Sequence, residues 1–153
     1  MNHFFLHHRT VRFGECDPAG VVYYPIFFNW FHECMEVWFE EALQIPYAEV
    51  IQNIGFPAKS CEANFFRPIP VGSAITLVLS LSEIRQKGIC LMFDIYRNHL
   101  PQNANMEQLS KSKLATGKVV CVGIGVQEGE FQFRPMDIPS ELRQKMSAYL
   151  QSK

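Results

Sequence analysis

Asp17 is the residue whose type and position most clearly suggest chemistry. It lies in the turn-forming sequence Asp17-Pro18-Ala19-Gly20, shortly before a long apolar segment that begins near Pro25. Pro25 suits the first position of a helix, because its ring presets the helical φ and its missing amide hydrogen would have no intrahelical partner. A helix start presents unpaired backbone amides and a partial positive charge, which can hold a carbonyl oxygen as it becomes an oxyanion. The sequence therefore predicts an active site at this helix start, although Asp before Pro and Gly is also common turn chemistry.

Other catalytic patterns are weak in this chain. The sequence contains no G-x-S-x-G nucleophile elbow, and its cysteines occur singly, outside the signatures of thiol catalysis. The segment His32–Glu36 resembles half of a zincin helix, but Glu36 stands where the second metal-binding histidine would be needed. We therefore expect neither serine or cysteine acyl transfer nor a catalytic metal.

Composition limits the remaining classes of function. The 153 residues, 48% of them hydrophobic and 19% charged, fit one domain over residues 1–153. A net charge of −1 offers no basic field for a nucleic acid or an anionic membrane. The densest apolar segment is interrupted by polar residues, so we expect no membrane span. A reducing, cytoplasmic location fits the five single cysteines, which are Cys16, Cys34, Cys61, Cys90 and Cys121.

The elements that would position Asp17 follow from hydrophobic periodicity. From Ile26 to Leu43 the polar residues form one narrow stripe at helical spacing, and nearly all other positions are apolar. This pattern predicts a helix that is covered on most sides. The residues of the polar stripe are Asn29, His32, Glu33, Glu36 and Glu40.

After Pro57 the periodicity changes to two, which is typical of strands. Strands are predicted over Ile75–Ser82 and Ile89–Asn98, joined by a tight hairpin at Gln86-Lys87-Gly88. Further strands are predicted over Phe4–Phe13, Leu114–Val126 and Phe131–Phe133, a loop over His99–Lys113, and a short amphipathic helix over Pro139–Leu150.

One long apolar helix followed by antiparallel strands predicts an α+β domain whose curved sheet wraps that helix. Such a sheet leaves a free edge and an incompletely covered face, which proteins commonly hide by pairing with a second copy. We therefore expect a homodimer at least.

A longer motif surrounds Asp17. It runs Phe13-Gly14-Glu15-Cys16-Asp17-Pro18-Ala19-Gly20 and continues with Val22-Tyr23-Tyr24-Pro25 and Trp30. This motif resembles the opening of the 4-hydroxybenzoyl-CoA thioesterase family, whose members adopt the hot-dog fold. A looser likeness continues through Ser60–Phe65, Arg67–Gly72 and Ile84–Gly88, and ends near Ile124.

The resemblance implies a role for two of these residues. In that family the aspartate at the position of Asp17 attacks the thioester carbonyl or activates water to do so, and the backbone amide at the position of Tyr24 holds the carbonyl oxygen. One carboxylate can suffice for a thioester, because a thiolate leaves far more readily than an amine and needs no dedicated acid.

The resemblance also suggests substrate-binding residues. His32 occupies the position where the 4-hydroxybenzoyl-CoA enzyme carries an acid that receives the ring hydroxyl, so His32 either contacts the acyl group or faces a partner subunit as a structural residue. Arg85 and Lys87 match a basic cluster of the family for the phosphates of coenzyme A, and Arg67 is a second candidate. Outside the resemblance, a hairpin lysine and a strand-end arginine are more often simply solvated surface residues.

The combined interpretation is a thioesterase that hydrolyses an aryl or other compact acyl-CoA to the free acid and coenzyme A, with no cofactor. The family resemblance further implies a homotetramer. Two alternatives stay open: a hydrolase of fatty acyl-CoA or acyl carrier protein thioesters, and a protein that binds acyl-CoA without turning it over. A binding module has no need for a carboxylate beside the carbonyl, where negative charge disfavours the oxyanion.

Overall fold

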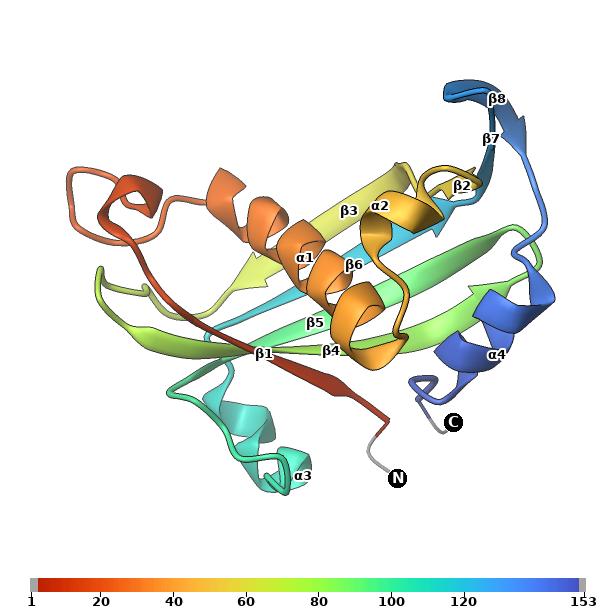
Figure 1. Ribbon diagram of the computed structural model, residues 1–153. Coiled ribbons are helices and arrows are strands. Elements are labelled where there is room, and N and C mark those ends of the chain that lie inside the picture. Colours follow the sequence, from red (N-terminus) through yellow and green to blue (C-terminus); the bar gives the residue numbers. More distant parts are fainter. Residues whose placement is uncertain (1–2, 152–153) are drawn as a thin grey trace.

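A five-stranded antiparallel sheet curves around one long helix in the computed structural model, which describes residues 3–151 (Figure 1). The helix is α1 (Pro25–Val37), and the strands follow the order β1-β4-β5-β6-β3 across the sheet. Their bounds are β1 Phe5–Thr10, β3 Ala58–Phe65, β4 Ala74–Arg85, β5 Gly88–Arg97 and β6 Ala115–Val122. The predicted α+β class, a curved antiparallel sheet around one central helix, is confirmed.

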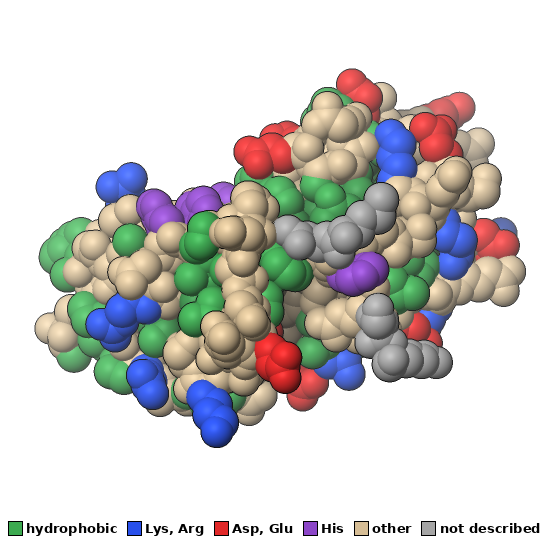
Figure 2. All heavy atoms as spheres, turned by 90° about the horizontal axis from the view of Figure 1, so that it is seen from below, with side chains coloured by type: hydrophobic (Ala, Val, Ile, Leu, Met, Phe, Trp, Pro, Cys, Tyr) green, Lys and Arg blue, Asp and Glu red, His purple; other side chains and the backbone are tan. Residues whose placement is uncertain are grey.

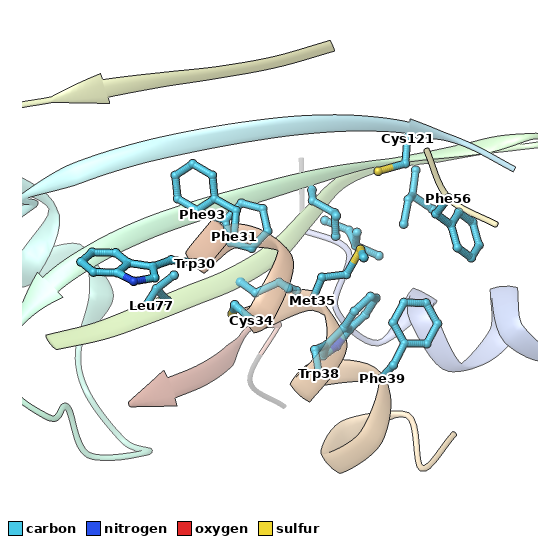
Figure 3. Packing of buried hydrophobic residues seen from close by; sticks show 14 of the residues in the cluster. Trp30, Phe31, Cys34, Met35, Trp38, Phe39, Phe56, Leu77, Phe93 and Cys121 are labelled. Atoms are coloured by element: carbon cyan, nitrogen blue, oxygen red, sulfur yellow. The ribbon is translucent and has the colours of Figure 1, made fainter. Parts of the chain in front are cut away.

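The apolar composition of α1 is explained by its enclosure. Figure 3 shows Trp30, Phe31, Cys34 and Met35 projecting from the helix into the cluster beneath the sheet, where each is almost fully buried. Removing such large side chains from water is the main stabilising contribution to this core. The polar stripe lies on the other side, as predicted: Glu36 is half-buried, and the exposed residues are Asn29, His32, Glu33 and Glu40.

The long helix is not α-helical to its end. It continues into a five-residue π-helical segment, Trp38–Ala42, in which the Leu43 N–H donates to Trp38 O at 3.1 Å. Gln44 then adopts φ +58, the left-handed conformation that commonly ends a helix. The predicted helix over residues 26–43 is thus confirmed, whereas the short helix α2 (Tyr47–Val50) that follows was not predicted.

Gly117 on β6 lets the helix approach the sheet closely. A Cβ atom at Gly117 would lie 2.2 Å from Cζ of Phe31, so only glycine leaves room for this ring. The Phe31 ring stacks on Phe93 of β5, with centroids 4.7 Å apart and planes 20° apart (Figure 3). Two aromatic side chains therefore join α1 to the middle of the sheet.

A smaller three-stranded sheet corrects one prediction. Residues 114–126 were predicted as one strand, but the chain breaks at Gly123 into β6 and β7 (Ile124–Gln127), and β7 pairs with β2 (Ile54–Gly55) and β8 (Glu130–Pro135). The break has a local cause: the Gly123 N–H donates to Lys87 O at 2.8 Å, which turns the chain out of the main sheet. A Cβ at Gly123 would also lie only 2.9 Å from Ile54.

The segment predicted as a loop over His99–Lys113 is also partly wrong. It contains a helical turn, α3 (Met106–Leu109), and a 3-10 turn over Ser110–Ser112. Met106 and Leu109 of α3 pack with Leu6, Val78 and Tyr96 on the sheet face opposite α1. Figure 2 views the molecule from below, where histidine side chains lie in two separate places and the Lys and Arg side chains form no continuous basic surface.

The two edges of the main sheet differ. Beyond the end of β1, the C-terminal segment extends the edge beside β4: after helix α4 (Ser140–Ser147), Leu150 forms a bridge with Leu81. The predicted C-terminal helix is confirmed, with Leu142 and Met146 buried. On the opposite edge, β3 has seven of its eight residues exposed, and within residues 3–151 no strand pairs with its outer side.

Candidate functional site

Asp17 opens a tight turn just before α1. The turn is closed by two backbone hydrogen bonds, from Gly20 N–H to Asp17 O and from Asp17 N–H to Val21 O, each 2.9 Å long. Gly20 has φ +76, a conformation that glycine adopts at little cost. One carboxylate oxygen, Oδ1, accepts from Ala19 N–H at 2.9 Å, and the described residues supply no partner for Oδ2. The Asp17 side chain is exposed and borders a hollow with Phe13, Cys16, Pro18, Gly20 and Val71.

The backbone N–H of Tyr24 is an unpaired donor at the helix start. Its neighbours are engaged or lack a hydrogen: Tyr23 N–H donates to Glu15 O at 3.3 Å, Ile26 N–H donates to Tyr23 O at 3.1 Å, and Pro25 has no N–H. Within residues 3–151 the Tyr24 N–H has no acceptor. Together with the partial positive charge of the helix start, this amide can receive an oxyanion.

An apolar pocket of about 250 Å³ lies between α1 and the sheet, next to the edge strand β3. Aromatic side chains form much of its wall, and His32 is the most polar group in it. A planar apolar group of one or two rings would find aromatic contacts there. The main lining residues are Phe28, Phe31, His32, Met35, Phe56 and Phe93.

His32 stands between this pocket and a second, more open hollow of about 410 Å³, which also includes Tyr47, Ile51 and Phe133. Its Nε2 lies 2.8 Å from Glu36 Oε1, one helical turn along α1, and its ring meets Tyr47 edge-on at 5.9 Å between centroids. Because Nε2 faces a carboxylate, a neutral His32 carries its proton there and leaves Nδ1 as an acceptor.

Two thiols near these hollows, Cys121 and Cys16, are shifted toward the neutral form. Burial, with smaller effects of Cys90 and Cys61, raises the pKa of Cys121 in the apolar pocket to about 11. Desolvation and the charges of Glu15 and Asp17 raise the pKa of Cys16. Neither environment favours the thiolate that cysteine catalysis requires.

The three predicted cations lie in two places. Arg67 is exposed on the loop after β3 and borders a hollow with Tyr24 and Phe27. Arg85 ends β4, where its guanidinium lies 2.9 Å from Glu83 Oε2. Lys87 is in the β4–β5 hairpin, with Nζ 3.8 Å from Asp137. These exposed ion pairs are weak enough to exchange for a phosphate partner.

The strand register shows that these residues occupy opposite ends of the sheet. At one end of β3, Phe65 packs on Phe27 of α1 with ring centroids 4.7 Å apart, close to Tyr24 and Arg67. At the other end, Ala58 pairs with Cys121. The eight residues of β3 span roughly 25 Å at about 3.3 Å per residue.

The β4–β5 hairpin belongs to the Ala58 end. Gly88 pairs with Val122, one residue beyond Cys121 on β6, so Arg85 and Lys87 lie at this end. One chain therefore brings Asp17, Tyr24 and Arg67 to one end of the sheet, while His32 opens toward the other end with Arg85 and Lys87.

Sequence reasoning missed two features of the site. Arg143 of α4 donates to the carbonyl oxygens of Arg85 and Gln86 at 2.7 and 3.0 Å, so it fixes the hairpin that carries the cations. Cys61 and Pro57 border the apolar pocket from the edge strand and the residue before it. No local pattern marks these residues, because their contacts depend on segments distant in sequence.

Comparison with known proteins identifies the family. A model of the thioesterase-like superfamily matches residues 11–146 of the chain. The chain belongs to this superfamily. The match begins just after β1 and ends within α4, and it includes every residue of the candidate site.

Curated relatives of this thioesterase-like chain carry related names. It is 39% identical over 98 residues to a 1,4-dihydroxy-2-naphthoyl-CoA hydrolase of Prochlorococcus marinus (strain NATL2A), covering 59% of this chain and 63% of that one. For the protein of that name from strain MIT 9515, identity is 31%, with coverage of 73% and 71%. The 4-hydroxybenzoyl-CoA thioesterase of Pseudomonas sp. (strain CBS-3) is 26% identical over 58% of this chain and 65% of its own. The chain thus spans slightly less than two thirds of two of these relatives.

Solved structures show the same fold. A gentisyl-coenzyme A thioesterase superposes with a TM-score of 0.74 at 25% identity, over 93% of this chain and 99% of the other. A 4-hydroxybenzoyl-CoA thioesterase, an aspartate-to-asparagine variant in complex with 4-hydroxybenzoyl-CoA, superposes with a TM-score of 0.76 at 18% identity, over 94% and 99%. The chain has the hot-dog fold.

Residues 3–151 contain no helix that is long and apolar enough to cross a membrane.

Proposed function

We propose that this chain is a thioesterase that hydrolyses a hydroxylated aryl-CoA to the aryl acid and coenzyme A. The observation that most supports the proposal is the presence of two unpaired groups beside the start of a buried helix. They are the Asp17 carboxylate, of which one oxygen has no partner among the described residues, and the Tyr24 backbone N–H. Membership of the thioesterase-like superfamily and the names of the relatives support it.

The reaction needs a nucleophile and an oxyanion donor. Asp17 Oδ2 attacks the thioester carbonyl, or removes a proton from the water that does so, and the carbonyl oxygen gains negative charge. The Tyr24 N–H then donates to that oxygen, an interaction that contributes on the order of 3 kcal/mol to transition-state stabilisation. The C–S bond breaks as the oxyanion collapses, and coenzyme A leaves as a thiolate. If Asp17 itself attacks, this step leaves an aspartyl–acyl anhydride, which water then hydrolyses to the aryl acid and the free Asp17 carboxylate. If water attacks, the aryl acid forms directly and Asp17 passes on the proton that it removed.

The apolar pocket is the proposed site of the aryl group. Its aromatic wall supplies stacking and edge contacts, and its volume of about 250 Å³ favours a compact group. At the pocket boundary, Nδ1 of His32 can accept a hydrogen bond from a ring hydroxyl while Glu36 holds Nε2. The relatives named above act, by their names, on naphthoyl, benzoyl and gentisyl thioesters with ring hydroxyl groups.

A second copy of the chain would complete the site. If the exposed β3 edges of two copies pair antiparallel about a twofold axis, the Phe65 end of one copy meets the Ala58 end of the other. Arg85 and Lys87 of the second copy would then lie near Asp17 of the first and could bind the phosphates of coenzyme A. We propose a homodimer formed in this way as the smallest active unit, and the homotetramer as its assembly.

Thiol release from a panel of acyl-CoAs tests the function. The panel contains 4-hydroxybenzoyl-, benzoyl-, 1,4-dihydroxy-2-naphthoyl- and palmitoyl-CoA, each assayed with the wild type and with Asp17→Asn. We expect the highest kcat/KM with a hydroxyaryl substrate and a loss of most of kcat in Asp17→Asn, whose circular dichroism stays that of the wild type. A folded variant that retains most of its kcat contradicts the mechanism.

The same panel separates the alternatives. A preference for palmitoyl-CoA would replace the aryl proposal with a fatty acyl-CoA hydrolase. Binding of acyl-CoA without thiol release from any substrate would make the chain a binding protein.

A further inference from the structure

Glu15 anchors the start of the turn that carries Asp17. Its Oε1 accepts hydrogen bonds from the Trp30 indole N–H, at 2.9 Å, and from the Arg9 guanidinium. Its Oε2 accepts from Arg12 N–H at 2.8 Å, and its backbone oxygen accepts from Tyr23 N–H at 3.3 Å. One residue therefore ties β1, the turn and the helix α1 together.

The partners of the Glu15 side chain are themselves held firmly. Trp30 is 1% exposed in the core, and the Arg9 guanidinium lies over its ring, 4.8 Å from the centroid. Arg9 also donates to Glu33 at 2.7 Å. Burial alone would raise the pKa of Glu33, but the hydrogen bonds and charges of His7 and Arg9 lower it. Glu33 therefore stays ionised and fixes the guanidinium from its other side.

The hydrogen bonds of the turn do not by themselves connect it to α1. The hydrogen bonds of Asp17 run to Ala19, Gly20 and Val21, all within the turn. These bonds define its shape, but they do not fix its place relative to α1. Two further hydrogen bonds, from Val71 N–H to Gly20 O and from Val22 N–H to Ile69 O, each 2.9 Å long, tie the turn to residues 69–71. Glu15 ties the start of the turn to α1.

We propose that Glu15 is a positioning residue of the active site. It holds the turn against α1 so that the Asp17 carboxylate and the Tyr24 N–H reach the same carbonyl group. This inference rests on the proposed thioesterase function. Glu15 acts on both catalytic groups. Its side chain fixes the start of the turn that carries Asp17, and its backbone oxygen accepts from Tyr23 N–H, next to the Tyr24 N–H.

The charge of Glu15 matters as well as its shape. The carboxylate receives three donors, one of them cationic, and leaves none of them unpaired. An amide in its place would present an NH₂ group toward one of these donors. Glu15→Gln should therefore loosen the turn while keeping the side-chain volume, and Glu15→Ala should loosen it further.

Kinetics of Glu15→Gln and Glu15→Ala test the proposal, with Glu107→Gln, an exposed acid on α3, as the matched control. A misplacement of about 1 Å can cost about a hundredfold in rate, so we expect kcat to fall tenfold to a hundredfold, normalised to the folded fraction. KM should change by less than about twofold, because binding contacts distant from the carbonyl are intact. A normalised kcat within about twofold of the wild type in both variants would overturn the proposal.

Amide hydrogen exchange tests it without any substrate. Residues 16–23 should exchange faster in both Glu15 variants than in the wild type and the Glu107→Gln control, while the strands keep their protection. Unchanged exchange at residues 16–23 would overturn the positioning role even if activity fell. Faster exchange in a chain that hydrolyses no acyl-CoA would sustain the role of Glu15 in holding the turn and would refute the proposed function instead.

Discussion

Gly117→Ala should both destabilise the protein and narrow the acyl pocket. The added Cβ would lie 2.2, 2.3 and 2.9 Å from three atoms of the Phe31 ring, far inside contact distance. The β6 backbone at Gly117 is paired on both sides, with Phe93 of β5 and Ala63 of β3, so the strand cannot easily move away. The ring must therefore move, and the empty space available to it is the pocket that it already lines.

The size of the effect follows from these distances. Ordinary contact begins near 3.4 Å, so the ring edge must retreat by about 1 Å or more. Overpacking of this kind costs about 1–3 kcal/mol, and each kcal/mol lowers the Tm of a chain of this size by about 2–4 °C. A ring displaced into a pocket of about 250 Å³ removes room for a second fused ring before it affects a single ring.

Thermal unfolding and paired kinetics measure the two effects. We expect kcat/KM for a naphthoyl thioester to fall about tenfold relative to that for the benzoyl thioester, the scale of 1–3 kcal/mol seen for small steric changes in a pocket. Gly125→Ala is the matched control, because its Cβ would meet only Met136 Sδ, at 3.6 Å. If Gly117→Ala matches Gly125→Ala in Tm and in the substrate ratio, then Phe31 does not shape the acyl site.

Two further predictions concern the cations and the histidine. Arg85→Ala and Lys87→Ala should mainly raise the KM for acyl-CoA, and this increase should be smaller at high salt. The KM for a truncated acyl-pantetheine thioester, which lacks the phosphates, should not change. An equal increase in KM for both substrates would show that these residues do not bind the phosphates. Mixing the Asp17→Asn chain with an Arg85→Ala/Lys87→Ala chain should give more activity than either alone, because a mixed dimer regains one intact site, and no gain would argue that one chain supplies both groups. His32→Ala should reduce kcat/KM for 4-hydroxybenzoyl-CoA more than for benzoyl-CoA, by about 1–2 kcal/mol, whereas a uniform change would mean a structural role.

Sequence patterns predicted the elements well where one periodicity dominates. The helix from residue 26 to 43, the β4–β5 hairpin and the C-terminal helix carry strong patterns and appear as predicted. Residues 114–126 share one apolar pattern, yet Gly123 divides them between two sheets through a contact with Lys87 that is distant in sequence. The turn α3 is stabilised because its apolar side chains bury Val78 and Tyr96 on the sheet face opposite α1. The sequence around residues 99–113 does not reveal these distant contacts.

The placement of the candidate site residues was predictable only in part. A motif places Asp17 and Tyr24 correctly at a helix start, because turn and helix-start chemistry are local. The support beneath them is not local, since Glu15 meets Arg9 on β1 and Trp30 on α1 only after these elements pack together. Such contacts cannot be derived from spacing along the chain.

The separation of the predicted residues along the sheet is the most informative result for function. Asp17 and Arg85 would be taken from the sequence as parts of one site, yet the register of β3, β5 and β6 puts them at opposite ends of a strand that spans roughly 25 Å. A single chain in which both act on one coenzyme A thioester would need its substrate to run the full length of the sheet. In the proposed dimer, antiparallel pairing of two exposed β3 edges would remove this need, because it would bring the cationic end of one copy to the Asp17 end of the other. The proposed dimer would give one common explanation for the open edge, for the exposed Phe65 at its end and for the separation of the candidate site residues.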